Sequence, residues 1–194
     1  MSDKNSWEKM CMGIQERSLG NTLLEVKSAK VLRSEIVKCL TSASDDKILN
    51  AKLDEILKLI KIAPSSQVPK SGYQEIMGGD KNQNRELHIP HFKLYNGCWF
   101  DFAITIDETT RHAQVIAFDF EIRFPKRKGE IAFPFLRIDL NLPNHKNEEK
   151  NMRFHLHPSH EDISIHSPPM SPLEILHMFL YGMDTLDNDK PRSF

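Results

Sequence analysis

The sequence contains few cysteines and no long apolar run. Its three cysteines, Cys11, Cys39 and Cys98, lie far apart, and none belongs to a CxxC pair. This argues against a disulfide framework and against a zinc knuckle, and it predicts buried, reduced thiols. No apolar stretch approaches the roughly 18 residues that a membrane helix needs, and no basic segment followed by an apolar one opens the chain. We therefore expect a soluble, cytoplasmic protein without membrane contact.

The chain also lacks an excess of charge of either sign. Its formal net charge is -1 and its pI is about 6.8, so no global positive field would draw it onto DNA or an acidic membrane. The sequence contains no GxSxG elbow, no P-loop and no GxGxxG turn, which removes the usual signatures of serine hydrolases and of nucleotide-binding folds. An RNA partner would have to use a local patch, for which Lys126-Arg127-Lys128-Gly129 is the candidate.

Residues 1–63 are predicted to form an N-terminal helical region, because apolar residues recur there at helical spacing in three one-sided stripes. The stripes are Trp7-Met10-Cys11-Ile14, Ala29-Leu32-Ile36-Leu40 and Leu49-Leu53-Ile56-Leu57-Ile60. The capping box Thr22-Leu-Leu-Glu25 is predicted to open the second helix, and the third is predicted to begin at Ser44 and to end before Pro64. Three such helices offer more apolar area than one small sheet face can bury, which predicts a protein partner or a homodimer contact through them.

Residues 64–92 are predicted to form a connector loop. Pro64, Pro69, Gly72 and the Gly78-Gly79 pair interrupt the segment, and a polar run follows at residues 80–84. A loop of this length is unusual in a compact domain. It therefore predicts a lid, a linker or a segment that a partner orders.

Residues 93–186 are predicted to form an antiparallel sheet and a closing helix. The apolar period changes to two, and one face of the strands carries Phe100, Phe102, Ile104, Phe118, Phe120, Ile138, Leu140 and Leu156. The start Ser171-Pro-Leu-Glu174 combines an N-cap, a proline in the first turn and a glutamate three residues later. The predicted fold class is α+β: N-terminal helices, then an antiparallel meander of about five strands with the C-terminal helix packed on one face.

The segment from Met152 to His166 holds four of the nine histidines. It is predicted to form strand, turn and strand, so that its apolar residues face the core and its histidines face the other, water-exposed side. If neighbouring strands pair in register, polar side chains from different strands lie about 5 Å apart on that side. The candidate site residues there are Asp139, Arg153, His155, His157 and His166.

Several chemistries suit this set, and the sequence leaves them open. Two imidazoles can serve as general base and general acid while an arginine stabilises the charge of a phosphodiester transition state. Alternatively, His155 and His157 bind a metal together with Asp139 or His166, as a two-histidine, one-carboxylate set. A third hypothesis is a nuclease of the D…(D/E)xK type with Asp101 or Asp107 ahead of Glu121-Ile-Arg123, although arginine replaces the lysine. A solvated face that merely mixes charges is the simplest alternative.

The last fifty or so residues resemble small bacterial proteins of toxin-antitoxin and phage-defence loci, TumE-type toxins among them. The segments that carry the resemblance are Leu136-Arg-Ile-Asp139, His145, His155-Leu-His157 and Ser171-Pro-Leu-Glu-Ile-Leu-His-Met-Phe179. The chain departs from those proteins by its helical N-terminus and by an insertion at residues 147–150. The resemblance implies a defence or toxin setting and suggests RNA as a substrate, but it assigns no catalytic residue.

Two classes of function follow. An enzyme, such as a small RNase-like hydrolase or toxin, would gather the polar residues in a cleft. A non-catalytic subunit or interaction module of a defence or regulatory complex would present a flat polar sheet and contact its partner through the N-terminal helices and the connector. The resemblance favours a bacterial defence-locus protein, and the sequence leaves catalysis and the metal requirement open.

Overall fold

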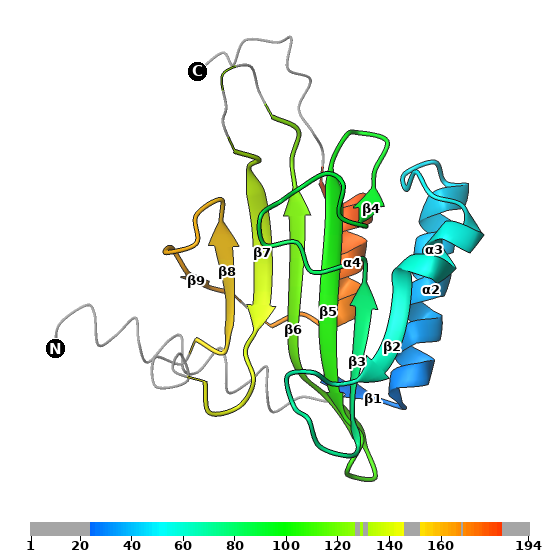
Figure 1. The fold of residues 1–194 in the computed structure, drawn as a ribbon, viewed down its shortest axis with the longest axis vertical. Helices are drawn as coiled ribbons and strands as arrows, with labels where there is room; N and C mark the ends of the chain where they lie inside the picture. The colour runs from blue at the N-terminus through cyan, green and yellow to red at the C-terminus, as the bar shows by residue number, and fades with distance from the viewer. Residues whose placement is uncertain (1–23, 127–128, 130–131, 146–151, 168, 184–194) are drawn as a thin grey trace, which may run out of the picture.

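The computed structural model describes residues 24–126, 129, 132–145, 152–167 and 169–183. Over these residues the chain folds into three helices and a nine-stranded antiparallel sheet (Figure 1). This confirms the α+β class with a C-terminal helix, although the sheet is larger than the five strands expected. The helix predicted around Trp7–Ile14 lies outside the described residues.

The sheet is built from long central strands and short flanking ones. Its order is β2-β3-β5-β6-β7-β8-β9, while β1 pairs with β6 and β4 pairs with β5. The strands are β1 (Glu25–Val26), β2 (Ile60–Pro64), β3 (Tyr73–Gly78), β4 (Phe92–Lys93), β5 (Trp99–Asp107), β6 (Ala113–Arg123), β7 (Phe135–Leu140), β8 (Phe154–Pro158) and β9 (Ile165–His166). The helices are α2 (Ala29–Asp45), α3 (Leu53–Leu59) and α4 (Pro172–Tyr181).

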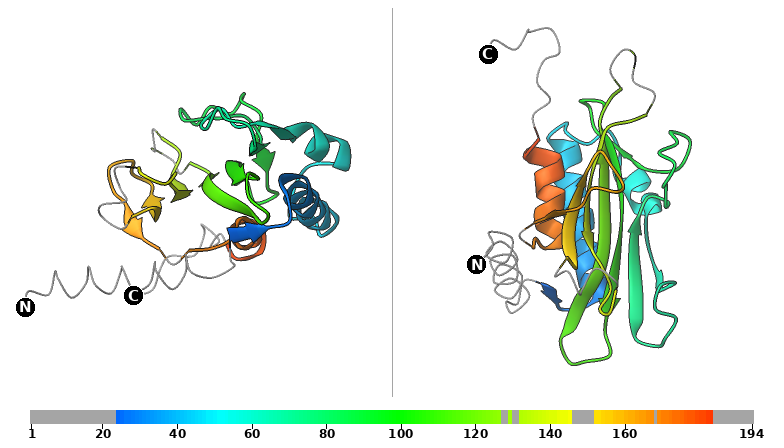
Figure 2. Two further views of the ribbon diagram at one scale, coloured as in Figure 1. Left: turned by 90° about the horizontal axis from the view of Figure 1, so that it is seen from below. Right: turned by 90° about the vertical axis from the view of Figure 1, so that its left-hand side faces the viewer.

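One face of the sheet is apolar and covered by helices. Helices α2 and α4 lie side by side on it (Figure 2), and the Tyr181 hydroxyl of α4 donates to Asp46 Oδ2, just beyond α2, at 2.9 Å. Of the eight residues predicted for this face, all are buried except Leu156, which is half-buried and packs against the same core. The predicted orientation of the strands is therefore confirmed.

The predicted start of the second helix was wrong. Glu25 belongs to β1, where it pairs with Gln114 of β6, and α2 begins only after Ser28. The Ser28 hydroxyl accepts a hydrogen bond from Val31 N at 3.2 Å, and the Glu108 carboxylate accepts one from Ala29 N at 2.7 Å. Pairing with β6 thus overrides the local capping box, while two other side chains satisfy the first amides of the helix.

The third predicted helix is shorter than expected. Helix α2 continues to Asp45, and α3 spans only Leu53–Leu59. Ile60, which had suggested more helix, instead begins β2 and pairs with Gly78 of β3. A short apolar run is compatible with a helix or with a strand, and here the pairing with β3 makes it a strand. The partner surface predicted for the N-terminal helices stays a prediction.

The expected connector at residues 64–92 contains the sheet strand β3. Gly78 is the last residue of this strand, and a Cβ there would lie 2.2 Å from the Phe102 ring, so the glycine makes room for an aromatic neighbour. The remaining loop, residues 79–91, crosses the face opposite the helices and returns to β4 (Figure 1). This loop brings side chains over the polar face of the sheet.

Candidate functional site

The polar face consists of two in-register rows of side chains that run across the strands. The first row contains Met77, Ala103, Asp119, Asp139, His155 and His166, one from each strand from β3 to β9 along the sheet. The second row contains Asp101, Glu121, Arg137 and His157. Directly opposed residues of neighbouring strands share a face of the sheet. The register therefore gathers acids, an arginine and imidazoles, as the sequence predicted.

The expectation that water reaches this face was wrong. Glu121 is 4% exposed, His155 2% and His157 7%. Two segments cover the face: the loop of residues 79–91, which supplies Arg85, and the turn after β8, which supplies Glu161. A sequence pattern assigns a residue to a face of a strand, but it does not reveal what a distant loop places on that face.

Arg85 links the loop of residues 79–91 to the sheet through hydrogen bonds and an ion pair. Its Nε and Nη2 donate to the two carboxylate oxygens of Glu121 at 2.8 and 3.0 Å, and Nη2 also contacts Glu161. The guanidinium lies 3.6 Å from the centroid of the Phe135 ring. A forked pair to one carboxylate fixes both distance and orientation. Arg85 therefore joins the loop, strand β6 and the turn after β8.

A second arginine is fully buried beneath the loop. Arg123 is 2% exposed, forms an ion pair with Asp101, and places Nε 2.7 Å from Glu121 Oε1. Its Nη2 also donates to the Asn82 carbonyl of the loop at 3.1 Å. Burial raises the pKa of Asp101 to about 7, although Arg123 opposes this effect. Desolvation of the carboxylate thus outweighs its attraction to the guanidinium.

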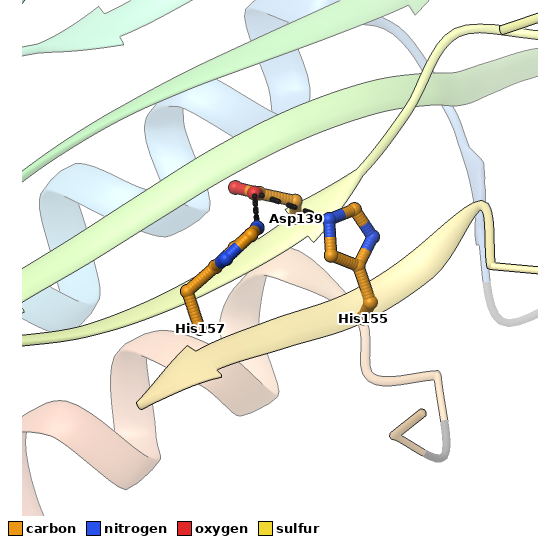
Figure 3. A group of neighbouring side chains, drawn as sticks. All are labelled: Asp139, His155 and His157. Carbon is orange, nitrogen blue, oxygen red and sulfur yellow. Dashed lines mark ion pairs between the residues drawn. The ribbon is translucent and has the colours of Figure 1, made fainter. Parts of the chain in front are cut away.

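Asp139, His155 and His157 form the tightest group of metal-ligating side chains on this face (Figure 3). Asp139 Oδ2 lies 3.3 Å from His157 Nε2 and 3.6 Å from His155 Nε2. The three candidate ligand atoms all lie within 4.8 Å of one another. Arg137 Nε donates to the same Oδ2 at 3.0 Å and orients the carboxylate. We call this group the Asp-His-His triad.

The two imidazoles of the triad have pKa values displaced in opposite directions. The hydrogen bond with Asp139 raises the pKa of His157. Burial lowers the pKa of His155, although the charge of Asp139 acts against it. Near neutral pH, the triad thus favours a neutral His155 beside a more basic His157.

The spacing of the triad suits a metal ion. Two donor atoms that each lie about 2.1 Å from one ion are separated by roughly 3.0–3.4 Å in tetrahedral or octahedral geometry. The two distances from Asp139 Oδ2 to imidazole nitrogens, 3.3 and 3.6 Å, are close to that range. Nitrogen and carboxylate donors match zinc, manganese and iron.

The other predicted site residues lie outside the triad. His166 is opposite His155 in register but is not one of the three grouped ligands. Arg153 donates to the Asn141 and Ile116 carbonyls at 2.9 and 2.8 Å, so it holds the backbone of neighbouring segments. Two residues of the nuclease hypothesis, Asp101 and Glu121, lie opposite each other on neighbouring strands. Both form ion pairs with the Arg123 guanidinium, which stands where a nuclease of this type has its lysine.

Arg85 is a functional candidate that the sequence did not predict, and its contacts with Glu121 and Glu161 were not predicted either. Arg85 lay in a segment predicted to be a connector loop, and Glu161 lay in a predicted turn. No local pattern indicates that these two residues meet each other and Glu121. Only the path of the loop across the sheet brings them together.

Two hollows open on the polar face beside the triad. The first has a volume of about 280 Å³, lies over Ala103 and is walled by Glu75, Asp101, Asp119 and Glu121, with Lys81 among its lining residues. The second has a volume of about 230 Å³ and includes Asp139, Asn141 and His145. Gln67, Asp119 and Arg137 line both hollows. The two hollows therefore adjoin along the row that leads to the triad.

No protein-family model, curated protein or solved structure matches this chain. Among the helices that the structure describes, none has the length and apolar character to cross a membrane.

Proposed function

We propose that this protein is a metal-dependent hydrolase in which the Asp-His-His triad binds one divalent ion of the zinc or manganese class. The observation that carries this proposal is the convergence of two Nε2 atoms on one carboxylate oxygen, at 3.3 and 3.6 Å, within a buried face. Water-exposed charges scattered over a sheet would have no reason to converge in this way.

The surroundings of the triad support hydrolysis. Asp139, His155 and His157 would hold the ion, and a bound ion would supply Lewis-acid chemistry for hydrolysis there. Arg137 both orients Asp139 and lines the two hollows, which place a substrate beside the triad. A buried polar floor with adjoining hollows fits a catalytic role better than a flat surface for a protein partner does.

A metal-free, RNase-like hydrolase is the second candidate. It is favoured by the opposite displacement of the His155 and His157 pKa values, which suits a general base paired with a general acid. Under this alternative the protein would be a toxin or defence-locus enzyme that acts on RNA, the setting that the resemblance of its C-terminal part suggests.

The metal content of the purified protein tests the first candidate. We expect close to one equivalent of zinc or manganese in the wild type, and binding of added Zn²⁺ by calorimetric titration. His155→Ala and His157→Ala should each weaken binding by roughly 10-fold or more, because each removes one of three ligands. His112→Ala is the matched control, since His112 is exposed at the end of the turn that joins β5 and β6. Equal Zn²⁺ binding by all four proteins would refute the site.

The two chemistries are then separated by hydrolysis of a carboxylic ester, p-nitrophenyl acetate, and of a phosphodiester, bis(p-nitrophenyl) phosphate. A metal-dependent hydrolase loses activity on treatment with a chelator and regains it with Zn²⁺ or Mn²⁺. Phosphodiester hydrolysis that persists in the chelator and is lost in both alanine variants would instead establish the metal-free alternative.

A further inference from the structure

We propose that the first hollow binds the cationic head of a small substrate, a primary ammonium or guanidinium group, with Asp119 as its counter-ion. This inference rests on the proposed hydrolase function, because it names the class of substrate that would reach the triad. The supporting observations are the shape of the hollow, the pairing of the charges around it and its position along the row of side chains.

The hollow is lined by Ala103, a small residue that lies between larger ones in the first row. Ala103 lies in register between Met77 of β3 and Asp119 of β6. Alanine is uncommon in the middle of a strand, where larger side chains pack better. The space above its methyl group, with a volume of about 280 Å³, suits a compact head group.

Carboxylates outnumber basic groups around this space. Five acidic residues and three basic residues line it. Two of the three basic residues are arginines that are already engaged: Arg123 by Asp101 and Glu121, and Arg137 by Asp139 and Glu161. The third, Lys81, is exposed. Lys61 pairs with Asp80 and Arg85 pairs with Glu121, so three of the five carboxylates have a cationic partner.

Two of the acidic residues have no ion pair among the described residues. Glu75 is 6% exposed and accepts hydrogen bonds from Ser66 N and Oγ at 3.3 and 3.0 Å. Asp119, on the strand beyond Ala103, is half-buried and has neither an ion pair nor a hydrogen bond from its side chain within the described part of the chain. A carboxylate that is partly removed from water and has no cationic partner is unfavourable. A bound cation would remove that cost.

The electrostatics of Asp119 agree with this reading. Burial and the neighbouring Asp139 carboxylate raise the pKa of Asp119 to about 6. A cationic head group beside Asp119 would favour the ionised form of this carboxylate. A phosphate or another anion would meet the carboxylates of Glu75 and Asp119, which have no ion pair among the described residues, so the hollow does not suit the backbone of RNA.

The position of the hollow connects cation binding to the proposed reaction. Asp119 pairs in register with Asp139, the carboxylate of the triad. The second hollow extends from Asp119 to Asp139, whose Oδ1 is buried and has no hydrogen-bond partner among the described residues. A substrate whose cationic head lies over Ala103 would therefore extend past Asp119 and present its reactive bond beside the triad.

Binding of four small probes to the full chain tests this inference. The probes are n-butylammonium, n-butylguanidinium, neutral 1-butanol and n-butyl phosphate, and calorimetry or ligand-observed NMR gives each Kd. We expect the two cations to bind and the alcohol and the phosphate to bind at least 10-fold more weakly. Asp119→Asn should weaken cation binding by about 10- to 100-fold, the usual effect of losing a charge-assisted hydrogen bond.

A second variant tests the shape of the hollow. Ala103→Ile fills the space and should abolish binding of the cations, whereas Ala63→Ile, a matched change on the edge strand β2, should leave it unchanged. Thermal unfolding identifies a variant that fails to fold, in which case Asp119→Asn carries the test.

Three results would overturn the inference: no cation binding by the wild type, equal binding of alcohol and cation, or preferred binding of butyl phosphate. The same titrations are repeated on protein stripped of metal. None of the three proposed metal ligands lines this hollow, so cation binding should not require the metal. Cation binding without Zn²⁺ binding would refute the proposed function alone, and Zn²⁺ binding without cation binding would refute this inference alone.

Discussion

The two faces of the sheet are both buried, but by different means. On the helix-covered face, Phe120 and its neighbours exclude water through apolar contact, with ring centroids of Phe102 and Phe120 5.0 Å apart. On the opposite face, Arg85 and Arg123 bury the carboxylates of Asp101 and Glu121 by pairing with them. Apolar burial stabilises a fold directly, whereas a buried ion pair recovers little more than its own desolvation cost.

This difference indicates what each face contributes. The apolar face supplies most of the stability, because its residues gain free energy from leaving water. The polar face adds little net stability and is costly to disrupt, which favours a role in binding or chemistry. The predictions that follow test this contrast, from the largest expected effect to the smallest.

Truncation on the apolar face should have the largest effect. Phe120→Ala removes a fully buried ring and should lower the free energy of unfolding by about 3–5 kcal/mol. Urea denaturation measures the change. Leu57→Ala, at a 44% exposed position of α3, is the control and should change stability by no more than about 0.5 kcal/mol. Equal losses in the two variants would contradict the assignment of the core.

Removal of one buried charge on the polar face should cost nearly as much. Arg123→Met leaves Asp101 without its counter-ion, and we expect a loss of roughly 3 kcal/mol at pH 8. The double variant Asp101→Asn/Arg123→Met should recover much of that loss, because it removes both charges. No recovery in urea denaturation of the double variant would show that Arg123 acts through packing alone.

The pH dependence of stability should reveal the raised pKa of the Asp101 carboxylate. The folded chain keeps the Asp101 proton up to a pKa of about 7, whereas the unfolded chain loses it near pH 4, so the folded state binds more protons between these values. This contribution makes stability fall as pH rises. Relative to Asp101→Asn, the wild type should lose at most about 2.7 kcal/mol between pH 5 and pH 7. Parallel profiles for the two proteins would contradict the prediction.

Metal binding should produce the smallest change in stability. At a free Zn²⁺ concentration ten times its Kd, we expect a gain of about 1.4 kcal/mol, because the ion binds only the folded state. Asp139→Asn, which weakens the carboxylate ligand, should reduce the gain in a thermal-shift assay. An unchanged gain in this variant would place any bound Zn²⁺ elsewhere on the protein.

The sequence was informative where one short pattern decides the outcome. Period-two alternation placed Phe118 and Phe120 in the core and put Asp139, His155 and His157 together on the other face, and the structure has them there. It failed at Glu25 and at Ile60, where pairing with a distant strand overrode a local helix signal. It also failed for Arg85, because no local pattern reports which strand a loop residue will meet.

The sequence by itself therefore determined the fold class, the orientation of the central strands and the side chains of the triad, because these depend on the alternation of residues along each strand. The tertiary structure alone decided that the polar face is buried, that Arg85 and Glu161 close over it and that a hollow opens above Ala103. These features depend on contacts between segments far apart in the chain, such as Arg85 with Glu121, which local periodicity does not encode.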